Sequence, residues 1–440
     1  MKYEHFLNHE VFKILSELSK ELKINAYVVG GYVRDCFLDI DNKDIDIVVE
    51  GSGIEFSAAF AVKTGEKHHF YENYGTAMVR FNGIEVEFVG ARKEMYERGS
   101  RNPIVEDGTL HDDLLRRDFT INAMAISLNK DTYGELIDPF DGYTDLKNGI
   151  IRTPGHMPNV TFSDDPLRIY RAVRFKTKLS TNDKTFKYDD DTWEAMENNV
   201  NRIGILTRER ITEEIVKIFS YRNSYIALED IRDLKIWAET FNTRTDRIMI
   251  KIQLVNQIDK LWFNATNETL QYLKWMAVLG PGSFTYADLE RNVRNVRLPF
   301  SFYDFMKKAY GCKTIITSTP SVEELKTVIA EIGHDIYDII KYWHAHELTY
   351  INEDNPDERI KEINEKYKRM KFLISMMAGE YIEFKCPVNG NEISDYMGVP
   401  LGPKIGEIKE LIEKGILNGS IHYSIEGVYW WMFNNRKNWK

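Results

Sequence analysis

The sequence contains few cysteines, no long hydrophobic run and no excess of positive charge. Its three cysteines, Cys36, Cys312 and Cys386, are too few and too scattered for a disulfide framework or a cysteine-rich zinc site. No apolar stretch approaches the ~18 residues of a membrane-spanning helix. The N-terminal residues carry Glu and His where a signal peptide needs a basic end and an apolar block. These absences predict a soluble, cytoplasmic protein without a membrane partner.

The chain is acidic, with 58 Lys and Arg against 68 Asp and Glu and a formal net charge of −10. A protein that coats DNA without sequence preference is normally basic overall, so no DNA partner is expected. At roughly 100–200 residues per domain, the 440 residues predict two to four domains. The hydrophobic content of 43% is ample for packed cores and excludes wholesale disorder.

The N-terminal third of the chain differs in pattern from the rest. It alternates short strand-like runs with turns and helices, which predicts an α+β domain, and residues 76–88 form an expected hairpin with its turn at Asn82-Gly83. From residue 160 onward, Gly and Pro become rarer and helical periodicity takes over. Amphipathic helices are expected over 207–222, 246–280, 321–347 and 357–380, and shorter helices over 386–420.

Two aspartates, Asp44 and Asp46, occur in the strand-like run KDIDIVV. Residues i and i+2 of a strand point to the same face, so the two carboxylates project together while Ile45 points to the other face. Like charges this close repel unless a cation lies between them, and Mg²⁺ suits the position because it prefers oxygen ligands and usually also holds substrate phosphates. Glu87, on a later strand, is a candidate third carboxylate. An isolated pair of this kind is more often a solvated strand end.

A candidate phosphate site precedes the aspartates. Gly30 and Gly31 end a strand and open a helix that carries Arg34. Glycine lets backbone N–H groups approach a phosphate, a helix N-terminus favours anions, and arginine adds a charged donor. A Gly-Gly pair alone is more often a plain turn. Followed by a strand with Asp-x-Asp, however, this arrangement describes a metal-dependent nucleotidyl-transfer site.

Arginines cluster in two later segments. Arg116-Arg117-Asp118 precedes an apolar element, and it is explained equally well by a capped helix start or by contacts to the triphosphate and ribose of a nucleotide. The second segment, residues 164–174, is expected to be helical because capping candidates and Pro166 stand at its start.

Four charged residues of the second segment are spaced by three along the expected helix: Asp165, Arg168, Arg171 and Arg174. A carboxylate accepts hydrogen bonds and a guanidinium donates them, whereas cytosine and adenine both present an amino donor beside a ring-nitrogen acceptor. An Asp165–Arg168 pair would therefore accept C and A and reject G and U. The alternative is a solvated helix face with an ion pair of little energetic weight.

These segments resemble the motifs of class II tRNA nucleotidyltransferases (CCA-adding enzymes) and bacterial poly(A) polymerases. The resemblance covers YVVGGYVRD with KDIDIVV, LLRRDFTINAMAI, the hinge-like DPFDGYTDLKNGIIR, and SDDPLRIYRAVRF, which is similar to the nucleotide-recognition motif EDxxR. It runs from about residue 25 to 220, and CPVNGNEISDYMGVPLGPKIGEI is a weaker echo of the family's tail. Asp164 stands where the motif has Glu, and little change is expected because the second acid and the arginine read the base.

The resemblance implies an α+β fold that starts with a polymerase-β-like head. This head, with a small mixed sheet, would occupy residues 1–155, followed by an all-helical neck at 156–222, body at 223–380 and tRNA-binding tail at 381–440. Some relatives carry an HD phosphohydrolase site in the body. Here the corresponding YLKWMAVLG lacks His and Asp, and His334-Asp335 has no suitable histidines nearby, so no such metal site is expected.

The resemblance also implies a role for each candidate residue. The metals would be held by Asp44 and Asp46, the triphosphate by Gly30, Gly31 and Arg34, and the nucleotide also by Arg117, with Asp118 near the sugar. Asp165 and Arg168 would read the base, supported by Arg171 and Arg174. Residues 92–112 would form the flexible loop that the family needs for the final A.

The predicted function is template-independent addition of C, C and A to tRNA 3′ ends from CTP and ATP. Two Mg²⁺ ions on Asp44 and Asp46 would activate the primer 3′ hydroxyl and stabilise the leaving pyrophosphate, with Glu87 as a weaker candidate for third carboxylate or base.

Three alternative functions are considered. A poly(A) polymerase would be expected to carry a basic GRRF-like segment after the catalytic strand, which this chain lacks. The full-length segment 92–112 argues against an enzyme that adds only CC but leaves an A-only enzyme open. The intact motifs disfavour an inactive nucleotide- or RNA-binding relative.

Local basic tracts reconcile the acidic chain with an RNA partner. Residues 164–178, 291–313 and 359–371 carry net charges of +3, +5 and +4, whereas residues 183–197 carry −4. Basic tracts in an acidic shell suit the binding of one folded RNA with salt-sensitive affinity. Each tract is equally consistent with a solvated helix face.

Overall fold

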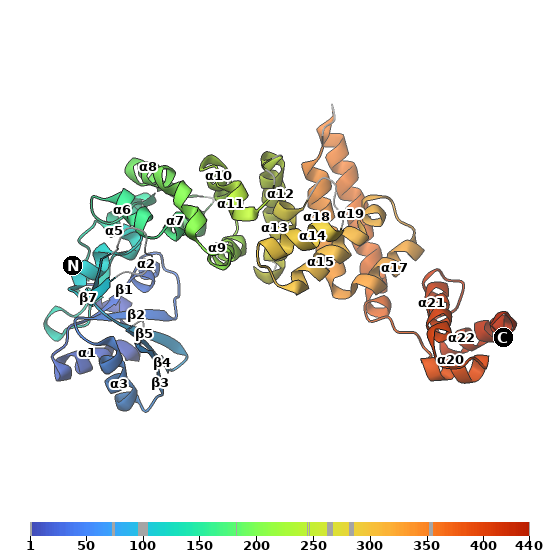
Figure 1. Ribbon diagram of the computed structural model, residues 1–440, viewed down its shortest axis with the longest axis horizontal. Coiled ribbons are helices and arrows are strands. Elements are labelled where there is room, and N and C mark those ends of the chain that lie inside the picture. The colour runs from blue at the N-terminus through green and yellow to red at the C-terminus, as the bar shows by residue number, and fades with distance from the viewer. Residues whose placement is uncertain are drawn as a thin grey trace. The chain divides into compact units, whose positions relative to one another are not determined.

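The computed structural model describes residues 2–72, 75–95, 104–181, 183–243, 245, 247–261, 267–280, 286–351 and 355–439. The chain divides into two compact units, Met1–Thr240 (unit 1) and Phe241–Lys440 (unit 2). Among the described residues, unit 1 holds all of the strands and unit 2 is helical (Figure 1). This agrees with the α+β head and helical remainder expected from the sequence. The four-part division into head, neck, body and tail stays a prediction.

Unit 1 is built on one seven-stranded sheet with the order β3-β4-β5-β2-β1-β8-β9. Strand β2 runs parallel to β5 and antiparallel to β1, so the sheet is mixed, as expected. Its strands are β1 (Ala26–Val29), β2 (Asp44–Val49), β3 (His68–Tyr71), β4 (Thr76–Phe81), β5 (Ile84–Gly90), β8 (Ala125–Ser127) and β9 (Leu136–Ile137). The turn between β4 and β5 has positive φ at both Asn82 and Gly83, the conformation that favours this residue pair in a two-residue hairpin.

One face of the sheet is covered by helices α1 (Glu10–Leu22) and α3 (Gly53–Thr64). Alternate residues of β2, such as Ile45 and Ile47, are buried on this face. Aromatic rings fill much of the space below α3, and the Phe60 ring centroid lies 5.4 Å from that of Phe88. This packing supplies the rigid base on which the other face of the sheet is held.

The other face is only partly covered. Helix α4 (Leu110–Leu115) packs there through Leu110 and Leu114 in a cluster with Val29 and Val48. Thr109 begins α4 with a capping box, in which its side chain and that of Asp112 satisfy each other's backbone N–H groups. The end of β2 that carries the two aspartates extends beyond this cluster.

The segment 92–112, expected to form a flexible loop, contains regular secondary structure in its described part. Strands β6 (Arg92–Met95) and β7 (Ile104–Asp107) pair antiparallel, and α4 begins at Leu110. Residues 96–103 lie outside the described residues. The structure also excludes one of the two interpretations of Arg116-Arg117-Asp118, namely a capped helix start. No α-helix starts there among the described residues, because Phe119 instead begins a 3₁₀ turn, η3 (Thr120–Asn122).

The expected helix over 164–174 begins later than predicted. Helix α6 (Pro158–Asp164) ends before Asp165, and α7 spans Leu167–Leu179. Asp165 has an extended conformation, with φ −136° and ψ 98°, because the residue before a proline is forced away from helical geometry. Arg168, Arg171 and Arg174 therefore share one helix, and Asp165 does not belong to it.

The remaining elements of unit 1 are short helices and strand pairs. They are η1 (Glu4–Phe6), α2 (Gly31–Phe37), η4 (Lys130–Thr132), α5 (Gly142–Asn148), β10 (Ile150–Ile151), β11 (Lys187–Tyr188), α8 (Asp190–Asn199), η5 (Val200–Ile205), α9 (Arg208–Ser220), α10 (Tyr225–Asp233) and α11 (Trp237–Phe241), whose last residue passes into unit 2. Helix α7 packs against α9 and α10, so the arginine helix is held on its far side by further helices.

Unit 2 contains the helices expected over 246–280, 321–347, 357–380 and 386–420, together with helices that were not predicted from the sequence. They are α12 (Ile248–Leu261), α13 (Asn267–Leu279), α14 (Tyr286–Asn295), α15 (Phe300–Gly311), α16 (Lys313–Thr317), α17 (Val322–Ile332), η6 (Gly333–Asp335), α18 (Ile336–Thr349), α19 (Pro356–Tyr381), α20 (Gly390–Met397), α21 (Pro403–Leu417), α22 (Ile425–Asn435) and η7 (Arg436–Asn438). His334 is exposed in η6. Within the described ranges, no helix has the length and apolar character to cross a bilayer.

Candidate active site

The two aspartates lie beside two glutamates on the neighbouring strand. In the parallel register of β2 and β5, Asp44 pairs with Glu85 and Asp46 pairs with Glu87. The four side chains therefore share the face that α4 leaves uncovered. The sequence prediction that Glu87 accompanies the aspartates agrees with this register. Glu85 is committed elsewhere, because its Oε2 lies 3.1 Å from Nε of Arg80.

The carboxylates repel one another. Burial raises the pKa of Asp46, and the negative charge of Asp44 raises it further, while Arg117 opposes both. Burial and the charge of Asp46 likewise raise the pKa of Glu87. A divalent cation would relieve this repulsion, and the donors are the hard oxygens that Mg²⁺ prefers. Within the part of the chain that the structure describes, no group of three or more His, Cys, Asp or Glu residues could by itself hold a metal ion. The donor set thus fits an ion that keeps substrate and water ligands.

The backbone conformation and the close neighbours of residue 30 require a glycine at this position. Its φ is +71°, and a Cβ atom at this position would lie 2.7 Å from Nη1 of Arg117 and 3.7 Å from Oδ2 of Asp46. The Gly30 N–H donates to the carbonyl of Met124 at 3.1 Å, so it does not face a ligand. The first helical bond of α2 is donated by Arg34 to the Gly30 carbonyl, which leaves the preceding N–H groups, Gly31 included, without intrahelical acceptors.

Arg116 and Arg117 are both held by Asp113, which the sequence analysis did not identify. Asp113 is fully buried on α4, where its Oδ1 accepts from Arg116 Nη2 at 2.5 Å and its Oδ2 from Arg117 Nη2 at 3.0 Å. Residues three and four apart on a helix lie close together, so the spacing of Asp113, Arg116 and Arg117 in the sequence could have predicted these two ion pairs. Asp113 fixes Arg117 beside Gly30 and Asp46.

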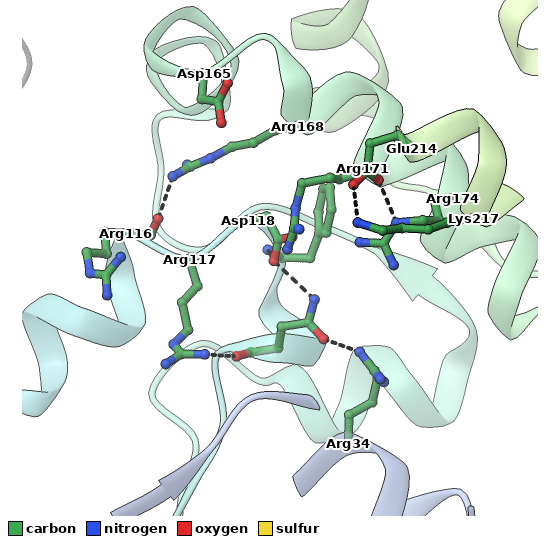
Figure 2. A network of polar contacts seen from close by, with 12 residues as sticks. Arg34, Arg116, Arg117, Asp118, Asp165, Arg168, Arg171, Arg174, Glu214 and Lys217 are labelled. Carbon is green, nitrogen blue, oxygen red and sulfur yellow. Dashed lines mark hydrogen bonds and ion pairs between the residues drawn. The ribbon is translucent and has the colours of Figure 1, made fainter. Parts of the chain in front are cut away.

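A polar network joins Arg34 to Asp118, both of which are labelled in Figure 2, through Asn122. Asn122 accepts from Arg34 Nη1 at 2.5 Å and donates to Asp118 Oδ1 at 3.0 Å, while its backbone carbonyl accepts from Arg117 at 3.4 Å. Arg34 also pairs with Asp35 at 2.6 Å and is almost fully buried. These contacts use three of the five guanidinium N–H groups, so a direct contact of Arg34 to a triphosphate would use one of the other two or break one of these contacts. No sequence pattern pointed to Asn122.

Asp118 joins this network to the arginine helix. Its Oδ2 accepts from Arg171 Nε at 2.7 Å and lies 2.5 Å from Arg171 Nη2. Burial alone would raise the pKa of Asp118, but Arg171, Asn122 and Arg168 lower it to about 2. Asp118 is thus held ionised and orients Arg171.

Asp165 and Arg168 have separate partners in the structure (Figure 2). Arg168 Nη2 donates to the carbonyl of Arg116 at 2.7 Å, and Asp165 Oδ2 lies 3.3 Å from Arg210 Nη2. Arg174 forms a buried pair with Glu214 at 2.6 Å. Of the four charges predicted to handle the base, Arg168 and Arg171 are the two that reach the RRD segment.

A cavity of about 1210 Å³ lies beside Arg116 and Arg168. Asp164 and His156 also line it, together with residues of the hinge-like segment such as Asp141. The cavity is larger than the usual volume of a small-ligand site. It brings the start of the arginine helix and the RRD segment to one open space.

Two family models match this chain. The model described as the poly A polymerase head domain matches residues 26–152, which span β1 to β10 and contain the carboxylates, Gly30, Arg34 and Arg117. The model described as the probable RNA and SrmB-binding site of polymerase A matches residues 185–243. The fold and the site therefore define a nucleotidyltransferase.

Several tRNA-processing enzymes are similar to the chain. An A-adding tRNA nucleotidyltransferase of Aquifex aeolicus is 32% identical over 79% of this chain and 41% of its own length. The A-adding enzyme of Halalkalibacterium halodurans is 32% identical over 65% of this chain and 68% of its own length. A CCA-adding enzyme of a Geobacillus species is 27% identical over 93% of both chains.

A solved structure supports the same relationship. A tRNA nucleotidyltransferase complexed with a primer tRNA and an incoming ATP analogue has a TM-score of 0.62, is 27% identical, and is matched over 81% of this chain and 99% of that one. The chain belongs to the family of tRNA nucleotidyltransferases and bacterial poly(A) polymerases. The resemblance inferred from the motifs is confirmed.

Proposed function

We propose that this protein adds C, C and A to the 3′ ends of tRNA, using CTP and ATP. The observation that carries the proposal is the row formed by Asp46 and Glu87, with Asp44 on the same face and Arg117 fixed beside Gly30. Negative groups that accept a cation lie next to a positive group that accepts a phosphate. Nucleotidyl transfer needs this combination.

The proposed reaction is an in-line displacement. The primer 3′ oxygen forms a bond to the α-phosphorus, and the bond between that phosphorus and pyrophosphate breaks. Asp44 and Asp46 would hold Mg²⁺, which supplies charge neutralisation at the attacking and leaving oxygens. Arg117 and the N–H groups at the start of α2 bind the triphosphate. Glu87 is the remaining carboxylate, and it would either bind the metal as a third ligand or accept the proton of the primer 3′ hydroxyl. Asp113 and Asn122 hold the positive groups in position.

Base selection is proposed for Asp165 and Arg168, with Arg171 and Arg174 in support. Arg168 borders the large cavity, and its guanidinium is within reach of a base bound there. For the two residues to read one base, the Arg168–Arg116 and Asp165–Arg210 contacts would have to open. The pair would then present an acceptor and a donor to C or A and mismatch G and U.

A second candidate function is addition of A alone, because two of the relatives at 32% identity are A-adding enzymes. Full CCA addition is preferred because a CCA-adding relative is matched over 93% of both chains.

One assay separates the candidate functions. The purified protein is offered tRNAs that end before the first C, before the second C and before the A, and an unstructured RNA, with each nucleotide triphosphate singly and then together. Completion of CCA on all three tRNAs is expected. Extension only of the tRNA that lacks the A identifies an A-adding enzyme, and long A tails on any RNA identify a poly(A) polymerase.

A further inference from the structure

The sheet face that carries the carboxylates continues onto two further strands. Asp46 pairs with Glu87, Glu87 with Met78 of β4, and Met78 with His69 of the edge strand β3. These residues form one row across the sheet. At about 4.8 Å between neighbouring strands, His69 lies about 14 Å from Asp46.

A hollow of about 470 Å³ lies at this end of the row. Its lining is Gly65, Glu66, Lys67, His69, Tyr71, Met78 and Arg80. The Tyr71 side chain is 57% exposed, and the Arg80 side chain is 76% exposed. The hollow therefore presents an aromatic ring, an imidazole, one carboxylate (Glu66) and two cations, Lys67 and Arg80, of which Arg80 also pairs with Glu85.

The opposite face of β3 differs. His68 and Phe70 point there, their rings stack with centroids 5.1 Å apart, and His68 Nδ1 lies 3.2 Å from Ser57 Oγ on α3. For the His69 and Tyr71 side chains, by contrast, the described part of the chain offers no ring, hydrogen-bond or ion-pair partner. The rings on the open face remain available for a ligand.

The geometry of nucleotidyl transfer determines the direction in which the primer lies on the carboxylate face of the sheet. In an in-line displacement the attacking oxygen and the leaving pyrophosphate lie on opposite sides of the α-phosphorus. The triphosphate site proposed above, at Arg117 and the start of α2, lies beside Gly30 on the β1 side of Asp46. The primer 3′ hydroxyl therefore approaches from the β5 side, and the nucleotides before it run toward β4 and β3.

We infer that Lys67, His69, Tyr71, Met78 and Arg80, together called the β3–β4 platform, bind the unpaired nucleotides that precede the primer 3′ end. This inference rests on the proposed function. About 14 Å equals roughly four steps of a stacked strand at ~3.4 Å each, whereas only two steps separate the first and last of the three unpaired nucleotides of a CC-ending tRNA, so these nucleotides reach the platform extended and not stacked on one another. Aromatic rings stack on bases of any identity, and the cations bind the phosphates between them.

The test compares two neighbouring aromatic residues on opposite faces of β3. Tyr71→Ala removes the ring on the platform, whereas Phe70→Ala, at a residue that is 48% exposed, removes one from the other face. Dissociation constants are measured for a tRNA that lacks CCA but keeps its unpaired 3′ nucleotide, for one that ends in CC, and for a blunt acceptor-stem hairpin. KM values for primer and for nucleotide triphosphate are measured in parallel.

The platform predicts a selective loss. Tyr71→Ala weakens binding of the CC-ending tRNA by at least roughly fivefold, since one stacking contact is worth ~1–3 kcal/mol. Binding of the blunt hairpin and the KM for nucleotide change less than twofold. Tyr71→Phe, which keeps a ring, and Phe70→Ala bind like the original protein. Lys67→Ala with Arg80→Ala lowers affinity and reduces its salt dependence.

Two outcomes overturn the inference: equal effects of Tyr71→Ala and Phe70→Ala, or an equal loss of blunt hairpin and CC-ending tRNA. These binding results are independent of incorporation. A protein that extends no RNA but shows the tail-dependent loss at Tyr71 refutes the proposed function and supports the platform. A protein that completes CCA but binds RNA equally well without Tyr71 supports the function and refutes the platform.

Discussion

The two units use their charged residues differently. In unit 1, ion pairs such as Arg171–Asp118 and Arg174–Glu214 join segments far apart in the sequence, and their carboxylates are nearly inaccessible. In unit 2, pairs such as Arg294–Glu290 and Lys414–Glu410 join consecutive turns of one helix and remain exposed. Exposed pairs contribute little to stability, whereas a buried charge is costly when its partner is removed. The cited charges of unit 1 are thus fixed in position, and those of unit 2 are left to interact with solvent or a ligand. The contrast is not complete, since the Lys274–Asp259 pair of unit 2 is buried and the Arg80–Glu85 pair of unit 1 is exposed.

The largest expected effect is at the carboxylate row. Asp46→Ala should lower nucleotide incorporation by at least roughly 10³-fold, because metal-assisted charge stabilisation is worth several kcal/mol. The measurement is single-turnover extension of a tRNA that lacks CCA. Asp288→Asn, at a partly exposed carboxylate paired with Arg291, is the control in unit 2 and should keep its activity. Retained activity in Asp46→Ala would refute the metal assignment.

A smaller but large effect is expected at Asp118. Arg171→Ala leaves this buried carboxylate without its main partner, which should cost about 2–3 kcal/mol of unfolding free energy, less than the ~3–5 kcal/mol of a fully buried pair because Arg171 is partly exposed. Hydrogen exchange of amides in α7 and η3 reports on unit 1 alone. Arg291→Ala is the matched control and should leave protection unchanged. Equal effects of the two substitutions would remove the contrast between the units.

The same carboxylate predicts a pH dependence. Its pKa is lowered to about 2 in the folded protein. A lowered pKa contributes stability above the unfolded value of ~3.9, and this contribution is lost as the pH falls toward 2. Asp118→Asn should therefore remove a pH-dependent ~2 kcal/mol at pH 6 that shrinks between pH 4 and pH 2. The measurement is the free-energy difference between the two proteins across this range. A constant difference would show that Asp118 is not specially stabilised in its ionised form.

The motif residues were predictable from the sequence because strand and helix periodicity determine local direction. Alternation along β2 predicted that Asp44 and Asp46 share a face, and Asn82-Gly83 predicted the hairpin that brings Glu87 beside them. Interactions between distant segments were not predictable. Asn122 joins Asp118 to Arg34, which lies 88 residues before Asn122 in the chain, and nothing in the local sequence distinguishes Asn122. Asp165 was misplaced on a helix because helical spacing was given more weight than the proline that follows it.

A substitution at Arg168 tests whether this side chain exchanges its contact with the Arg116 carbonyl for a contact with the base of the nucleotide. Arg168→Ala should reduce discrimination of C and A against G and U by ~1–3 kcal/mol, or roughly 5–150-fold. The measurement is the ratio of kcat/KM values for the four nucleotides. Affinity for tRNA should change much less, since the Arg168–Arg116 contact lies inside unit 1. Unchanged selectivity would remove this residue from base reading.

The smallest effect on stability is expected in the basic tract 291–313 of unit 2. The Arg294 side chain is 73% exposed and its pair with Glu290 spans four residues of one helix, so Arg294→Ala should change the unfolding free energy by less than ~0.5 kcal/mol. If the tract contacts RNA, this substitution weakens tRNA binding at low salt and lowers the slope of log Kd against log salt by about 0.7–0.9 for each phosphate that is no longer neutralised. Binding titrations at several salt concentrations measure that slope. An unchanged slope would mean that the charge of Arg294 serves solvation alone, and it would restrict RNA recognition by this tract to other residues.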